Sequence, residues 1–119
     1  MALSGVGGCK RAADDAGGVA IEQEVSPQPA RVGAGTVRIQ LKDRATAQAV
    51  AGAKVSLEAE MSHPGMAPVL GEAREVAPGK YEGTIQFSMA GTWVILLHIT
   101  LPDGKKIERE IRVGNVRDS

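Results

Sequence analysis

The stretch TVRIQLKD, residues 36–43, decides the fold class because its apolar and polar side chains alternate strictly. In an extended chain, successive side chains point to opposite faces of the sheet. One face of this segment would therefore carry Val37, Ile39 and Leu41, and the other the polar residues between them. This alternation predicts a β-strand with one face in the core and the other in solvent.

The same period of two recurs along the chain. Three further segments show it clearly: AKVSLEAEM (53–61), KYEGTIQFS (80–88) and KKIEREIRV (105–113). Two show it more weakly: VAIEQEV (19–25) and LGEAREVA (70–77). Segment TWVILLHITL (92–101) is instead apolar on both faces, which is typical of a central strand. In segment 105–113, Arg109 falls in the inward phase, which indicates an edge position or the margin of a sandwich.

Turn signals separate these segments. Proline and glycine clusters recur about every ten residues, and PDG at 102–104 is typical of a tight hairpin. No apolar period of 3.6 residues is sustained anywhere in the sequence. Seven short strands at this spacing predict an all-β fold, a seven-stranded antiparallel immunoglobulin-like β-sandwich.

Composition limits the size of the protein and its partners. With 119 residues the chain allows one domain, and with one Trp, one Tyr and one Phe its core must be largely aliphatic, Trp93 being the largest side chain. The 14 basic and 14 acidic residues balance, and no basic stripe appears, so we expect no nucleic-acid partner. The sequence contains no run of about 20 apolar residues that could span a bilayer.

The N-terminal segment differs from the rest. Residues 1–18 are small, polar and rich in glycine, which predicts a flexible tether before a sandwich domain at 19–115. The single cysteine, Cys9, cannot form an intrachain disulfide. Residues 6–9, VGGC, resemble a bacterial lipobox, which implies a lipid anchor at Cys9 and a periplasmic or cell-envelope location. The alternative is a glycine-rich tail that matches by chance.

Three methionines and a histidine are placed where they could meet. Met61, His63 and Met66 lie within six positions at the end of one predicted strand, and Met89 lies at the end of another. Antiparallel neighbours reverse direction, so both strand ends belong to the same end of the sandwich. Thioether sulfur and imidazole together favour Cu(I) over Zn²⁺, Mg²⁺ or Ca²⁺. The predicted metal ligands are therefore Met61, His63, Met66 and Met89.

Each of these residues also has an ordinary structural interpretation. Met61 is in phase with the predicted core, His63 precedes a Pro-Gly turn, and Met89 could pack against the nearby tryptophan. Met66, on an exposed loop, is the hardest to explain as a core residue. His98 is not a candidate ligand, because it lies up to roughly 30 Å beyond Met89 along a strand that rises ~3.3 Å per residue.

Three segments of the sequence resemble a known family. MSHPGMAP (61–68), PGKY (78–81) and MAGTW (89–93) are similar to segments of the YtkA-like and FixH-like domains of bacterial envelope proteins. The resemblance covers residues 35–113 and implies a small immunoglobulin-like sandwich. FixH-like members are associated with copper-pump and cytochrome-oxidase assembly systems, so the resemblance also implies copper. They look membrane-anchored, so only the part outside the membrane compares with this chain.

These observations give two functional hypotheses. The first is a small envelope domain that binds Cu(I) through its Met/His cluster as a copper chaperone, sensor or resistance factor, with a metal ion and another envelope protein as partners. The alternative is an interaction or structural module of a lipoprotein that binds no metal. An enzyme is not expected, because the sequence offers no nucleophile beside a base and no phosphate-binding loop.

Overall fold

The computed structural model describes residues 18–27, 29–61, 65 and 67–118. The expected tether with Cys9 lies outside these ranges, as do His63 and Met66. The described residues form the strands β1 (Val19–Ser26), β2 (Gly33–Asp43), β3 (Lys54–Met61), β4 (Val69–Ala77), β5 (Lys80–Phe87), β6 (Gly91–Thr100) and β7 (Lys106–Val116). They include no helix long and apolar enough to cross a bilayer.

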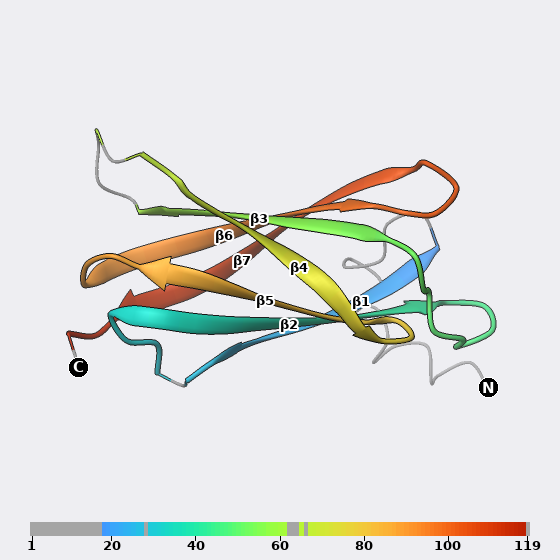
Figure 1. Ribbon diagram of the computed structural model, residues 1–119, viewed down its shortest axis with the longest axis horizontal. Helices are drawn as coiled ribbons and strands as arrows, with labels where there is room; N and C mark the ends of the chain where they lie inside the picture. The colour runs from blue at the N-terminus through green and yellow to red at the C-terminus, as the bar shows by residue number, and fades with distance from the viewer. Residues whose placement is uncertain (1–17, 28, 62–64, 66, 119) are drawn as a thin grey trace, which may run out of the picture.

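The strands are joined into one antiparallel sheet in the order β1-β2-β5-β4-β3-β6-β7 (Figure 1). The predicted all-β, seven-stranded immunoglobulin-like fold is confirmed. β6 lies between β3 and β7, as its apolar sequence indicated, and β7 ends the sheet, as the inward phase of Arg109 indicated. The hairpin predicted at PDG is also present: the N–H of Gly104 donates to the carbonyl of Leu101 at 2.8 Å.

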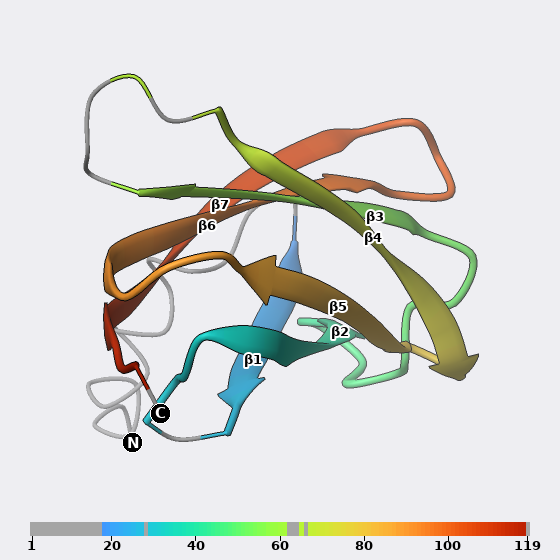
Figure 2. The same cartoon turned by 60° about the vertical axis from the view of Figure 1, so that its left-hand side comes forward.

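The sheet folds over on itself into two layers (Figure 2). One layer holds β3, β6 and β7, the other holds β1, β2 and β5, and β4 runs from the first layer to the second. The segment before β2 joins the end of β7. There the N–H of Val32 donates to the carbonyl of Arg117, and the N–H of Arg117 donates to the carbonyl of Ala30, each at 2.8 Å. These bonds link the two layers at one edge of the sandwich.

The core between the layers is mainly aliphatic and includes three aromatic rings. Trp93, Tyr81 and Phe87 are its largest fully buried side chains. The Phe87 and Trp93 rings meet edge to face, with centroids 5.3 Å apart and planes inclined at 75°, an arrangement that aromatic pairs favour. Among the described residues, none that is polar or charged is buried.

Two glycines allow β4 to lie close to its neighbours as it changes layers. A Cβ at Gly83 would lie 2.7 Å from the carbonyl oxygen of Glu72 and 2.9 Å from a methyl group of Leu57. A Cβ at Gly71 would lie 2.8 Å from the carbonyl oxygen of Thr84. Real Cβ atoms do not approach backbone atoms so closely, so the close pairing of β4 with β5 depends on the absence of side chains at Gly71 and Gly83.

Candidate metal centre

The end of β3 and the start of β6 bring the first two candidate ligands to one end of the sandwich. Met61, the last residue of β3, pairs with Trp93 of β6. Met89 comes two residues before Gly91, where β6 begins. Chain reversal thus places Met61 and Met89 at the same end, at the left of Figure 1. We call Met61, Met89, Gly91 and Trp93 the methionine rim.

Met61 is half-buried and packs against the core. Its methyl group lies directly over Gly91: a Cβ built on that glycine would be 2.6 Å from the Met61 Cε. The Gly91 backbone has φ +139°, a conformation that residues with side chains rarely adopt. Met61 therefore packs against the core, as its phase indicated, while the end of its side chain reaches the first residue of β6.

Met89 is held by its backbone rather than by its side chain. The indole Nε1–H of Trp93 donates a hydrogen bond of 2.9 Å to the Met89 carbonyl oxygen. Trp93 is 1% exposed, whereas Met89 is 43% exposed. A buried ring thus anchors the chain at Met89 while the Met89 thioether remains open to solvent.

The other two predicted ligands, His63 and Met66, lie outside the described residues. They follow Met61 directly in the sequence, in the connection that leads to β4. The structure thus places Met61 and Met89 at the same end of the sandwich, and the ligand roles of all four residues stay predictions from the sequence.

The donor chemistry of the rim suits a soft cation. A methionine sulfur is neutral at every pH and prefers Cu(I) to the harder divalent ions. In the part of the chain that the structure describes, no group of three or more His, Cys, Asp or Glu could hold a metal ion. Of the four predicted ligands, the described residues include the thioethers of Met61 and Met89.

His98 belongs to a different environment, as the sequence indicated. It lies on the outer face of β6, with Nε2 3.1 Å from an oxygen of Glu58 and Nδ1 3.1 Å from an oxygen of Glu108. Glu58 also affects Glu60: a side-chain hydrogen bond between these two carboxyl groups raises the pKa of Glu60. These contacts span β3, β6 and β7, and the sequence alone did not reveal them because they depend on the register between strands.

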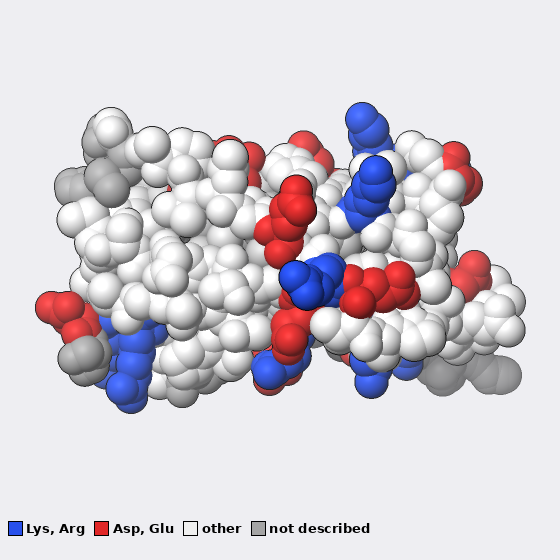
Figure 3. Space-filling view, viewed as in Figure 1, with Lys and Arg blue, Asp and Glu red and all other residues white. Residues whose placement is uncertain are grey.

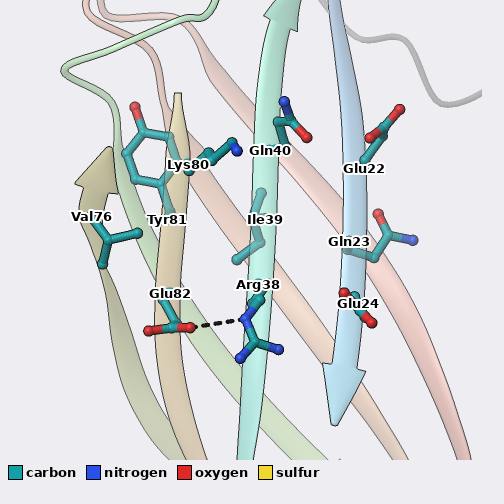
Figure 4. Close-up of a pocket in the computed structure, with 10 residues that line it drawn as sticks. All are labelled: Glu22, Gln23, Glu24, Arg38, Ile39, Gln40, Val76, Lys80, Tyr81 and Glu82. Carbon is teal, nitrogen blue, oxygen red and sulfur yellow. Dashed lines mark hydrogen bonds and ion pairs between the residues drawn. The ribbon is translucent and has the colours of Figure 1, made fainter. Parts of the chain in front are cut away.

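A hollow on the surface lies elsewhere (Figure 4). It has a volume of about 620 Å³ and lies over β1, β2, Val76 of β4 and the start of β5. Its lining carries charges of both signs, and Arg38 Nε lies 2.9 Å from Glu82 Oε2 within it. Neither Met61 nor Met89 lines this hollow.

On the face seen in Figure 3, the left-hand end shows few charged side chains except along its lower edge. Three large apolar residues are exposed near this end of the strands: Leu70 (73%) at the start of β4, Met89 (43%), and Val32 (37%) just before β2. Two of them have charged neighbours, because Leu70 pairs with Glu58 and Val32 bonds to Arg117.

Over residues 15–98 the sequence matches the YtkA-like family. The chain belongs to the YtkA-like family. The match covers well over half of the chain and includes all four predicted ligands, and it confirms the resemblance seen in the Met/His loop and the MAGTW segment. No curated protein matches the sequence.

A solved structure shares the fold of this YtkA-like domain. The PmoD soluble domain from Methylocystis sp. ATCC 49242 (Rockwell) is similar with a TM-score of 0.56 and 12% identity, over 85% of this chain and 94% of that one. Murine CRIg is similar with a TM-score of 0.44 and 11% identity, over 82% of this chain and 98% of that one. At identities this low, the similarity to the PmoD domain concerns the fold alone. The TM-score of CRIg is too low to support any argument.

Proposed function

We propose that this YtkA-like domain binds Cu(I) in the bacterial cell envelope, as a copper chaperone, sensor or resistance factor. Its ligands are Met61, His63, Met66 and Met89. The observation that carries the proposal is the position of Met61 and Met89, from two separate segments, at the same end of the sandwich.

The thioether donors of the methionine rim suit a soft monovalent cation such as Cu(I). Thioethers bind Cu(I) without losing a proton, and with imidazole they offer the few soft donors that this ion prefers. Met61 is half-buried beside Gly91, whereas Met89 is exposed. A cation held between them would be partly shielded from water and still accessible to an incoming ligand, as transfer to another protein requires.

A competition titration tests this proposal. The purified domain is titrated with Cu(I) without oxygen against a chromophoric chelator, together with Met61→Leu, Met89→Leu, Met66→Leu and His63→Gln. Leucine keeps the volume of methionine but removes the sulfur. We expect each change to weaken binding and His98→Gln, on the outer face, to leave it unchanged. Wild-type affinity in all four variants would show that the assigned ligands are wrong.

An exposed large apolar residue favours a second candidate, an interaction module that binds no metal. Exposed apolar surface can mark a contact with another protein, and Leu70 is 73% exposed. Two variants separate the candidates. If copper is the ligand, Met89→Leu weakens Cu(I) binding and Leu70→Ser does not. If a protein is the ligand, Leu70→Ser reduces its capture from envelope extract, whereas Met89→Leu, still apolar, retains it.

A further inference from the structure

We infer that Trp93 and Gly91 are positioning residues for the thioether site: they fix Met89 and Met61 at the rim before any metal arrives. This inference rests on the proposed function and adds two residues that cannot themselves donate sulfur. It assigns a role to three positions of the MAGTW segment, Met89, Gly91 and Trp93, in one arrangement.

Trp93 acts on Met89 through the backbone. Its Nε1–H donates to the Met89 carbonyl oxygen at 2.9 Å, and its ring is 1% exposed and packed edge to face on Phe87. A ring held on all sides by the core has little freedom to move, so the hydrogen bond transmits that rigidity to the turn before β6. The position of the Met89 Cα is therefore set by the core, although the Met89 side chain is in solvent.

Gly91 acts on Met61 through the space it leaves open. Any residue with a Cβ at position 91 would place that atom 2.6 Å from the Met61 Cε, so the methyl end of the Met61 side chain would have to move. The φ of +139° further disfavours replacement. Because Met61 is paired with Trp93 across the strands, the same tryptophan flanks both methionines. The two ligand positions thus share one rigid support.

Such a support matters for affinity. Ligands that are already in place when a metal arrives do not lose further conformational freedom on binding, and residues that orient ligands are worth a large factor in metal affinity. The arrangement predicts that removing either support weakens the site while both sulfurs remain in the chain.

The geometry can be tested first without metal, by nuclear magnetic resonance of protein labelled at its methionine methyl groups. We expect a nuclear Overhauser effect between the Met61 methyl group and the Gly91 α-protons, because a Cβ there would almost touch that methyl. In Gly91→Ala the Met61 methyl resonance should shift. Gly33→Ala is the matched control: Gly33 also has positive φ, +115°, but its Cβ would meet nothing within 4 Å. A Met61 resonance that is equally unaffected in both variants overturns the role of Gly91.

The role in binding is then measured with Ag(I), a redox-stable substitute for Cu(I), by titration of the same labelled proteins. We expect Gly91→Ala and Trp93→Phe each to weaken binding about 10-fold, the lower end of the loss typical of residues that orient metal ligands. Gly33→Ala should bind as the wild type does. Phe87→Leu, which disturbs the same aromatic pair but keeps the indole hydrogen bond, should lose much less affinity than Trp93→Phe.

The outcomes separate this inference from the proposal beneath it. If wild-type protein binds Ag(I) and both positioning variants bind as tightly as their controls, the positioning role is wrong and the proposed function stands. If wild-type protein does not bind Ag(I), the proposed function is wrong and the positioning role falls with it. If Gly91→Ala and Trp93→Phe bind Ag(I) more weakly while the control variants do not, the result supports both the positioning role and the proposed function.

Discussion

The hydroxyl group of Tyr81 donates a hydrogen bond of 2.7 Å to the carbonyl oxygen of Val50 and accepts one of 3.1 Å from the N–H of Ala53. Tyr81 lies on β5 and is 1% exposed, and both partners belong to the connection between β2 and β3. One buried side chain thus satisfies two backbone groups of a long loop and ties that loop to the core.

We expect Tyr81→Phe to lower the free energy of unfolding by about 1–3 kcal/mol, because the Val50 carbonyl and the Ala53 N–H lose their partner in a poorly solvated place. Urea denaturation measures this loss. Arg38→Gln serves as a control, since the Arg38–Glu82 pair is largely exposed and such pairs contribute about 0–1 kcal/mol. Equal stabilities for the two variants would contradict the anchoring role of Tyr81.

The same residue predicts how stability changes at alkaline pH. Burial raises the pKa of the Tyr81 hydroxyl above its ordinary value of 10.0; the Glu75 carboxylate adds to this, and the hydrogen bond from Ala53 opposes it. Below pH 10 the tyrosine is neutral in both the folded and unfolded states. Above it the unfolded chain ionises first, so the free energy of unfolding should fall as pH rises through this range.

This is measurable because Tyr81 is the only tyrosine in the chain. Tyrosinate absorbance should appear at higher pH in folded protein than in urea, and Tyr81→Phe should lose the associated part of the pH dependence. Identical titration curves in the folded protein and in urea would show that burial does not protect the hydroxyl.

A third prediction concerns the close pairing of β4 with β5. Gly83→Ala should lower the free energy of unfolding by about 2–3 kcal/mol, because the new methyl group would press on the backbone of β4 and overpacking of this kind is costly. Thermal or urea unfolding measures the change. The control is Gly104→Ala in the β6–β7 hairpin, where the backbone has φ +95° but a Cβ meets nothing within 4 Å. A smaller loss at Gly83 than at Gly104 would contradict the steric role.

The strands and the sandwich could be predicted from the sequence because alternation is a local property. Val37, Ile39 and Leu41 are buried as the pattern of residues 36–43 indicated. The common end of Met61 and Met89 could also be predicted, since it follows from chain reversal alone. Both predictions required only which face a residue occupies and which way each strand runs.

Contacts between strands could not be predicted in the same way. The pairing of His98 with Glu58 and Glu108 depends on a register that no single segment encodes. The closeness of Gly91 to the Met61 methyl group depends on the same register. The hydrogen bond from Trp93 to Met89 joins residues only four apart, but its geometry depends on how the core holds the ring.

The last prediction uses the chemistry of the thioethers themselves. Dilute hydrogen peroxide should oxidise Met89 faster than Met61 in the metal-free protein, because Met89 is 43% exposed and Met61 is half-buried against Gly91. A sulfur that donates a lone pair to a metal is a much weaker nucleophile toward peroxide, so saturating Ag(I) should slow oxidation of both residues. Peptide mapping by mass spectrometry after timed quenching gives the two rates. Protein with Gly91→Ala provides the comparison, because a displaced Met61 should be oxidised sooner and protected less. Unchanged rates at Met61 and Met89 in the presence of Ag(I) would mean that neither sulfur binds the metal.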